Sequence, residues 1–176
     1  KFLSHYLKKN SKIKIKPEIL IEPGTALASK AIDFAVKVIS IKKINEVFYV
    51  NTTGSKYNMN PSPNRINSPT QILNFNSKSS LKLNHAKLCG YTCIETDIIH
   101  HDFNGSISVG DIIIFNEVGS YSVVMKPPFI LPDVPIIQYD YKRKEFEIVR
   151  SKQTFNDIFG NFNFLNKWLI YSTLLI

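Results

Sequence analysis

This 176-residue sequence has few cysteines and no long hydrophobic run. Two cysteines, Cys89 and Cys93, cannot build a disulfide framework, and they lack the second ligand pair that a CxxC-type zinc site needs. No apolar run reaches the ~20 residues that span a bilayer, and the first ten residues lack the apolar segment of a signal peptide. We therefore expect a cytoplasmic protein without a metal site or a membrane span.

Arginine is also scarce, which matters because the chain carries a formal net charge of +8. A basic chain invites a nucleic-acid interpretation. However, only 3 of the 22 basic residues are arginine, and the basic residues are spread along the chain apart from a short cluster at residues 142–144. Nucleic-acid-binding proteins favour arginine, because its guanidinium group can form two hydrogen bonds to a phosphate or a base. The sequence also has no zinc finger, helix-turn-helix or RNP motif. We expect no nucleic-acid partner.

The first 26 residues have the pattern of an α/β unit. Residues 1–10 have apolar side chains at helical spacing, and residues 13–21 form an apolar strand that ends at the sequence Glu-Pro-Gly. A single helix–strand unit can neither pair its own sheet edges nor bury both faces of its strand. We therefore interpret residues 1–26 as the last piece of a larger α/β barrel.

From residue 27 onward the sequence is rich in β-branched residues and turn signals. Several short strands separated by turns are typical of a closed or sandwiched antiparallel β-domain. This domain is expected to cover residues 27–159. Its expected strands cover residues 31–41, 46–50, 81–83, 86–88, 111–115, 121–125, 136–141 and 146–150.

Residues 160–176 form an apolar tail that differs from the β-domain. It is too short to span a membrane. A helix or strand that docks on apolar surface is the favoured interpretation, and a membrane or partner anchor is the alternative.

Two segments carry side chains that could take part in catalysis or ligand binding. Residues 89–97, CGYTCIETD, combine a turn glycine, a thiol and two carboxylates. Such a segment is often structural, because buried cysteines pack as small hydrophobes, but it can also present a proton donor beside carboxylates for a cationic substrate. In residues 119–122, GSYS, a phenol beside a small-residue turn could donate to an anion. The pair His100-His101 is interpreted as surface polar, since neighbours in a strand point to opposite faces.

Four motifs occur together in one order: EPGTAL at residues 22–27, CGYTCIETD at 89–97, VGDIIIF at 109–115 and GSYSVVMKPPFI at 119–130. This combination resembles the pyridoxal-phosphate-dependent decarboxylases of the ornithine, diaminopimelate and arginine type (fold type III). The resemblance implies a mainly β fold: the C-terminal β-barrel or sandwich domain of such an enzyme, preceded by the last helix–strand piece of its cofactor-holding barrel.

The resemblance also implies a set of cofactor-binding residues. Glu22 matches the partner of the pyridine nitrogen, which keeps the ring an electron sink. Gly24 and Tyr121 match contacts of the cofactor phosphate. Thr25 is assigned to the same phosphate, although many members of the family have arginine there.

Cys93 matches the cysteine that the family contributes across a dimer interface, which implies a general acid. Glu95 and Asp97 are assigned to substrate binding. Ile94 stands where many members have the acidic residue that binds the substrate's distal group, so the amino-acid substrate stays open. For Asp97 a loop cap is the favoured alternative, because aspartate is frequent in turns.

The family's Schiff-base lysine lies in the barrel and matches no lysine of this sequence. The chain alone is therefore expected to be inactive and to need a barrel-bearing partner or a longer homodimeric enzyme, of polyamine or lysine biosynthesis. The alternative is a catalytically silent β-domain that acts only in protein association.

Overall fold

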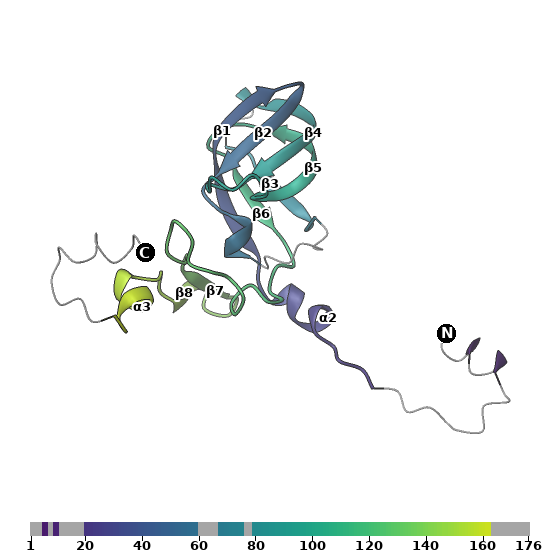
Figure 1. The fold of residues 1–176 in the computed structure, drawn as a ribbon, viewed down its shortest axis with the longest axis vertical. Coiled ribbons are helices and arrows are strands. Elements are labelled where there is room, and N and C mark those ends of the chain that lie inside the picture. The colour runs from purple at the N-terminus through teal and green to yellow at the C-terminus, as the bar shows by residue number, and fades with distance from the viewer. Residues whose placement is uncertain (1–4, 7–8, 11–19, 60–66, 76–78, 163–176) are drawn as a thin grey trace, which may run out of the picture.

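The computed structural model describes residues 5–6, 9–10, 20–59, 67–75 and 79–162, and Figure 1 shows their arrangement. Strands dominate the described residues, and the helices are short. The helical elements are α2 (Thr25–Ala28), η1 (Ser29–Ala31), η2 (Lys56–Asn58) and α3 (Phe155–Phe159). The strands are β1 (Phe34–Ile44), β2 (Val47–Thr52), β3 (Thr70–Leu73), β4 (Leu81–Cys89), β5 (Ile98–Ile107), β6 (Ile112–Phe115), β7 (Ile136–Asp140) and β8 (Glu145–Arg150).

Six strands form one strongly curved sheet in the order β3-β6-β1-β2-β4-β5. The pairs are antiparallel except for β2 and β4, which run parallel. The long strand β1 pairs with β6 through residues 34–37 and with β2 through residues 38–44, with an irregularity between Val38 and Ser40. Such an irregularity bends a strand, and the sheet here curls into a nearly closed barrel (Figure 1).

The barrel interior is filled by residues that alternate along the strands. In the first six residues of β1 every second side chain is buried, which is the period expected when one face of a strand lines a core. The fully buried side chains include Val50, Leu88 and Ile113. The mainly β fold expected from the sequence is confirmed.

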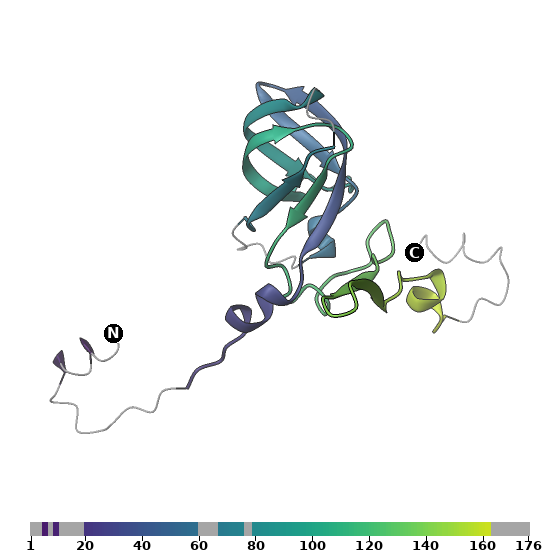
Figure 2. The ribbon, with the colours of Figure 1, turned by 180° about the vertical axis from the view of Figure 1, so that it is seen from behind.

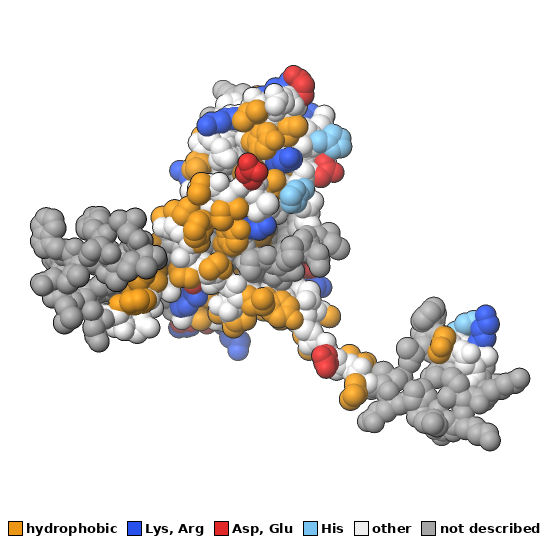
Figure 3. Space-filling view, viewed as in Figure 1, with side chains coloured by type: hydrophobic (Ala, Val, Ile, Leu, Met, Phe, Trp, Pro, Cys, Tyr) orange, Lys and Arg blue, Asp and Glu red, His pale blue; other side chains and the backbone are white. Residues whose placement is uncertain are grey.

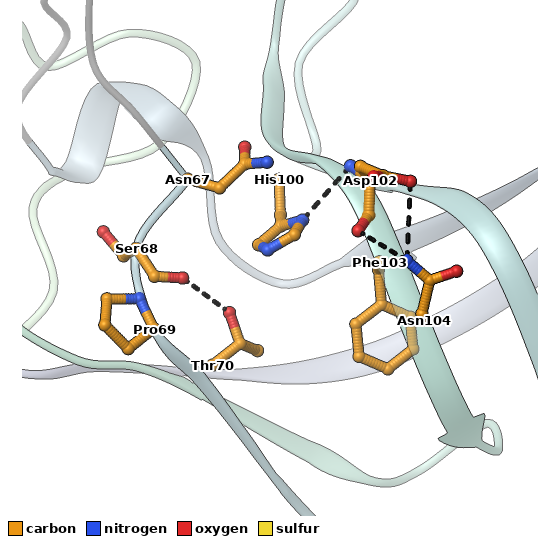
Figure 4. A pocket seen from close by; sticks show the side chains of 8 residues that line it. All are labelled: Asn67, Ser68, Pro69, Thr70, His100, Asp102, Phe103 and Asn104. Carbon is orange, nitrogen blue, oxygen red and sulfur yellow. Dashed lines mark hydrogen bonds between the residues drawn. The ribbon is translucent and has the colours of Figure 1, made fainter.

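The outer strands β3 and β5 meet along a seam that side chains bridge. The amide oxygen of Asn67 accepts a hydrogen bond from the backbone N–H of His101 (3.0 Å), and the side-chain N–H of Asn74 donates to the carbonyl of Ser106 (3.4 Å). A polar cleft of about 420 Å³ lies at this seam (Figure 4). Side-chain bridges of this kind cover the sheet edges that β3 and β5 would otherwise expose.

Asp111 ties the loop before β6 to the segment after β3. Its buried carboxylate accepts hydrogen bonds from the backbone N–H groups of Ser108 (2.8 Å) and Phe75 (3.0 Å) and from the side chain of Asn74 (2.7 Å). Burial alone would raise the pKa of Asp111, but these hydrogen bonds outweigh it and hold the pKa below its ordinary value. The aspartate of the VGDIIIF motif is therefore a structural anchor.

Strands β7 and β8 form a separate two-stranded sheet beside one end of the barrel, followed by α3 (Figures 1 and 2). The partly buried carboxylate of Asp133 holds this region through ion pairs with Lys126 (3.2 Å) and Arg150 (3.5 Å). Apolar side chains here lie largely in solvent: Ile148 is 69% exposed and Phe146 71%. Figure 3 shows hydrophobic side chains gathered over the lower half of the molecule.

Two of the sequence-based strand predictions need correction. The strand predicted for residues 121–125 is wrong, because Tyr121 has a positive φ of 63° and Met125 donates its N–H to the Tyr121 carbonyl (3.0 Å), which closes a turn. The two strands predicted around residue 85 are one strand, β4, whose pairing with β5 is irregular near His85 (φ 52°). Strand β5 itself was not predicted.

The predictions for the two ends fall mostly outside the described residues. Of the apolar strand predicted at residues 13–21, the structure describes Leu20 and Ile21, which are 86% and 77% exposed and have no regular secondary structure. Of the apolar tail, residues 163–176 lie outside the described residues. Within the part that is described, no helix has the length and apolar character needed to cross a membrane.

Candidate functional site

The segment before β1, which carries the predicted phosphate-binding residues Gly24 and Thr25, meets the segment after β6, which carries the predicted residue Tyr121, at one corner of the molecule. The hydroxyls of Thr25 and Ser120 lie 3.1 Å apart, although 95 positions separate them in the sequence. A β-carbon at Gly24 would lie 3.6 Å from the hydroxyl oxygen of Tyr121. We call these four residues, Gly24, Thr25, Ser120 and Tyr121, the hydroxyl corner.

The hydroxyl corner forms because Gly119 lets two backbone segments approach closely. The N–H of Gly119 donates to the carbonyl of Ser29, and the N–H of Val118 donates to that of Ile32, both at 2.9 Å. A β-carbon at Gly119 would lie only 2.3 Å from the carbonyl oxygen of Ala28. The glycine of the GSYS segment therefore serves to bring Ser120 and Tyr121 against the segment that carries Gly24 and Thr25.

The chemistry of the hydroxyl corner fits a phosphate group. Thr25, Ser120 and Tyr121 each carry a hydroxyl, and because the hydrogen bond between Thr25 and Ser120 uses one of the three protons, two remain to donate to an anion. Thr25 and Tyr121 are exposed, whereas Ser120 is buried. Tyr121 holds a left-handed backbone conformation, which costs energy for a non-glycine residue and occurs often at functional sites. Ser120 was not among the predicted site residues; its position directly before the tyrosine of the motif was the available signal.

Glu22, the predicted partner of the pyridine nitrogen, precedes this corner by two residues. It lies in the segment before α2, which has no regular secondary structure, and its side chain is exposed. Its carboxylate is therefore accessible to solvent, two positions before Gly24 in the sequence.

A second group of predicted residues lies in the loop between β4 and β5. We call residues 90–97 the cysteine loop. Cys93 and Glu95 are exposed in it, whereas Asp97 is only 3% exposed. Gly90 donates its N–H to the carbonyl of Asp97 (2.9 Å), which closes the loop at its base.

The carboxylate of Asp97 is occupied by donors of the chain itself. It accepts hydrogen bonds from the hydroxyl of Ser55 (2.9 Å to each oxygen), the N–H of Lys56 (2.8 Å), and the hydroxyl and N–H of Thr92 (2.7 and 3.2 Å). This arrangement is that of a loop cap, the favoured alternative for Asp97. Its assignment to substrate binding stays a prediction.

The two cysteines differ sharply in environment. Cys89, at the end of β4, is half-buried, and burial followed by the negative charge of Asp97 raises its pKa to about 11, although Lys87 opposes this. Cys93 is exposed in the loop. A thiol with a raised pKa is a poor nucleophile at neutral pH, so Cys93 is the accessible thiol of the pair.

Tyr91 links the cysteine loop to the chain that follows the hydroxyl corner. Its N–H donates to the carbonyl of Gly54 (3.0 Å), and its hydroxyl lies 3.5 Å from the carbonyl oxygen of Phe129. The Phe129 ring packs edge-on against Tyr57, with ring centroids 6.2 Å apart. Burial raises the pKa of the Tyr91 phenol. The two predicted parts of the site are thereby connected through one segment.

The polar cleft at the seam is a different feature. It is lined by residues 67–70 and by His100, Asp102, Phe103 and Asn104, and none of the predicted site residues lines it (Figure 4). His100 points into the cleft and accepts a hydrogen bond from the N–H of Asp102 (3.3 Å), and burial lowers its pKa. In the portion of the chain that is described, no group of three His, Cys, Asp or Glu side chains is placed to hold a metal ion.

These features define a class: a small β-barrel domain with a hydroxyl-lined corner and an exposed thiol on a loop. The family model described as "Pyridoxal-dependent decarboxylase, C-terminal sheet domain" matches residues 25–119. The chain therefore belongs to this family, as its C-terminal sheet domain, and the cofactor of a complete enzyme of the family is pyridoxal phosphate.

Solved structures of similar fold include two diaminopimelate decarboxylases and one arginine decarboxylase. The diaminopimelate decarboxylase of M. jannaschii, in co-complex with L-lysine, is 20% identical over 92% of this chain and 36% of its own, with a TM-score of 0.66. That of Helicobacter pylori, also complexed with L-lysine, is 16% identical over 79% and 34%, with a TM-score of 0.64. The Paramecium bursaria Chlorella virus arginine decarboxylase bound to agmatine is 22% identical over 61% and 30%, with a TM-score of 0.51.

This chain thus spans about a third of the length of the solved structures it resembles. At these identities the likeness establishes a shared fold. The comparison with curated proteins by sequence found no match.

Proposed function

We propose that this chain is the C-terminal part of a pyridoxal-phosphate-dependent amino-acid decarboxylase of the ornithine, diaminopimelate and arginine type, working in the cytoplasm. Residues 1–26 are the end of the cofactor-holding barrel, residues 27–159 the β-domain and residues 160–176 an apolar tail. The observation that carries the proposal is the hydroxyl corner, in which the two motifs assigned to the cofactor phosphate touch through Thr25 and Ser120.

In this proposal the hydroxyl corner holds the cofactor phosphate. Gly24 leaves room for the phosphate beside the hydroxyl of Tyr121, while Thr25 and Tyr121 donate hydrogen bonds to its oxygens. Glu22, two residues earlier, stabilises a proton on the pyridine nitrogen. Pyridoxal phosphate, when bound, supplies the electron sink for the electron pair left behind by carbon dioxide.

Cys93 then acts as the general acid. Its exposed thiol donates a proton to the substrate carbon that has lost carbon dioxide, and in a homodimer that substrate lies in the site of the neighbouring subunit. Glu95, exposed two residues later, binds a cationic distal group of the amino-acid substrate. Diaminopimelate, ornithine and arginine each carry such a group, and each is a candidate substrate.

The chain needs a barrel to complete this site. The family's cofactor lysine matches no residue here, so the chain by itself is inactive in this proposal. The exposed apolar side chains of β7 and β8, such as Phe146 and Ile148, supply surface for a barrel-bearing partner or a second subunit.

A catalytically silent association domain is the second candidate. The specific observation in its favour is Thr25, which provides a hydroxyl where many relatives have a positive charge for the phosphate. In that case the hydroxyl corner would be a structural contact between α2 and the turn at Tyr121.

Decarboxylation separates the two candidates. The protein that carries this chain together with its cofactor barrel is assayed for pyridoxal-phosphate-dependent release of carbon dioxide from diaminopimelate, ornithine, arginine and lysine. We expect release from at least one of the four, and we expect Cys93→Ser to lower kcat at least about a hundredfold, the size of a lost general acid. Absence of release from all four, with pyridoxal phosphate bound, would favour the silent domain.

A further inference from the structure

We propose that Asp97 is a positioning residue of the site: its carboxylate fixes the cysteine loop to η2 and so sets the position of Cys93. This inference rests on the proposed function for the role of Cys93. It assigns the carboxylate to the loop instead of the substrate, which leaves Glu95 as the carboxylate of this loop that is free to meet a substrate.

The first observation is that both carboxylate oxygens of Asp97 accept hydrogen bonds from other residues of this chain. On one side they accept from the hydroxyl of Ser55 and the N–H of Lys56, at the start of η2. On the other side they accept from the hydroxyl and N–H of Thr92. Because Asp97 is 3% exposed, these bonds form away from water, where an unmade hydrogen bond is expensive.

The second observation is that Asp97 meets a rigid partner. Ser55 caps η2: its hydroxyl accepts from the N–H of Tyr57 (3.1 Å), and its own N–H donates to the side chain of Asn58 (3.0 Å). Ser55 is fully buried. The loop is therefore held to a capped turn of the barrel.

The third observation is that the contact reaches both neighbours of Cys93. The hydroxyl of Thr92 donates to Asp97 at 2.7 Å and accepts from the N–H of Ile94 at 3.3 Å. One hydroxyl thus links the residue before Cys93, the residue after it and the buried carboxylate. The backbone on either side of the thiol is fixed by the same small network.

The fourth observation is the absence of space at Gly90. A β-carbon there would lie 2.1 Å from a carboxylate oxygen of Asp97. The carboxylate packs directly against the glycine backbone at the base of the loop, so Gly90 is needed to seat Asp97.

A matched pair of substitutions at Thr92 tests the proposal in the decarboxylase that carries this chain with its cofactor barrel. Thr92→Val keeps the shape of the side chain and removes its hydroxyl, while Thr92→Ser keeps the hydroxyl. We expect Thr92→Val to lower kcat at least about tenfold with KM within about twofold, and Thr92→Ser to stay within about twofold of wild type for both, as for one hydrogen bond to a charged group. Asp102→Asn, on the exposed side of β5, serves as the carboxylate control and is expected to leave both constants unchanged.

Amide hydrogen exchange supplies a readout independent of activity. In the same protein, Thr92→Val and Asp97→Asn should accelerate exchange of the Thr92 and Lys56 amides, whereas Asp102→Asn should not. Unchanged kcat in Thr92→Val, or equal losses in Thr92→Val and Thr92→Ser, would overturn the positioning role.

Cys93→Ser distinguishes this failure from a failure of the proposed function. If Cys93→Ser lowers kcat and Thr92→Val does not, the proposed function stands and the role of Asp97 falls. If Cys93→Ser leaves kcat unchanged, the general-acid role of Cys93 in the proposed function falls, and the amide exchange still decides whether Asp97 fixes the loop.

Discussion

The barrel and the segment that follows it bury their apolar residues very differently. In the barrel, strands β1 and β6 turn alternate side chains into a closed core, and Val38 and Ile113 are almost completely buried. In the β7–β8 hairpin, most apolar side chains of both strands remain exposed. A two-stranded hairpin is marginally stable without further packing. The barrel therefore has a core of its own, whereas the hairpin leaves its apolar side chains exposed among the described residues.

The candidate site lies where these two regions meet. Tyr91 in the cysteine loop contacts Phe129, which lies between the hydroxyl corner and the hairpin. Among the described residues, the barrel holds the cysteine loop and the hydroxyl corner next to a hairpin whose apolar side chains are exposed, which is consistent with the proposal that the domain completes a site with a barrel.

The largest expected effect is on the barrel core. Ile113 is fully buried and Ile148 is 69% exposed, so the same substitution should have a large effect on stability at one position and a small effect at the other. We expect Ile113→Ala to lower the free energy of unfolding by about 2–5 kcal/mol and Ile148→Ala to change it by less than about 0.5 kcal/mol. Urea denaturation of this chain measures both. Equal losses would mean that the hairpin belongs to the same cooperative core.

The two cysteines provide the next contrast. A pKa of about 11 instead of the ordinary 9.0 lowers the thiolate fraction of Cys89 about a hundredfold near pH 8. We expect iodoacetamide to modify Cys93 first and to leave Cys89 largely unmodified until the chain unfolds. Peptide mass spectrometry identifies the modified residue, and Cys93→Ser should abolish the fast reaction. Fast modification of Cys89 in the folded chain would contradict the environment described for it.

The third effect concerns pH and the anchor at Asp111. Its pKa is lowered in the folded chain, so its contribution to stability is complete above the unfolded pKa near 3.8 and is lost as the pH falls through the lower folded value. Asp111→Asn should lower the free energy of unfolding at pH 7 by about 1–3 kcal/mol and flatten its decline below pH 4. Denaturation at several pH values measures this.

Asp140 in the hairpin is the control for that experiment. Its pKa is also lowered, chiefly by Arg143, but the pair lies in solvent between β7 and β8. Asp140→Asn should leave the unfolding of the barrel unchanged at every pH value of that experiment. A loss as large as that of Asp111→Asn would show that the hairpin supports the barrel.

The smallest expected effect is at the surface of the hairpin. Ile148→Asp places a charge among exposed apolar side chains without opening a cavity. Light scattering should show less self-association of this chain in the variant, with unchanged circular dichroism. Unchanged association would mean that this face of the hairpin is not a contact surface.

Parts of the fold with strong local patterns were predictable from the sequence. The β-branched runs of β1 and β6 predicted strands within a few residues of the observed ends. Strand β5 was missed because it contains HHDFNGS, which has no apolar alternation; pairing with β4 stabilises it. The apolar run after Tyr121 suggested a strand, but the positive φ of Tyr121 turns the chain.

The contacts within the candidate site were harder to predict from the sequence, because they join residues that are far apart in the chain. The motifs indicated Thr25 and Tyr121, but the partnership of Thr25 with Ser120 spans 95 residues, and that of Ser55 with Asp97 spans 42. No local pattern encodes which hydroxyl meets which oxygen. These contacts follow from the closure of the barrel, which brings η2 to the cysteine loop and α2 to the turn at Tyr121.

Cofactor binding at the hydroxyl corner tests the central claim most directly. The affinities of pyridoxal phosphate and of pyridoxal, which lacks the phosphate, are measured by absorbance titration of the decarboxylase that carries this chain with its barrel. We expect Tyr121→Phe to weaken the binding of pyridoxal phosphate about tenfold, as for one hydrogen bond to a charged group, and to leave the binding of pyridoxal unchanged. Unchanged binding of pyridoxal phosphate, or an equal loss for both compounds, would contradict a phosphate site at this corner.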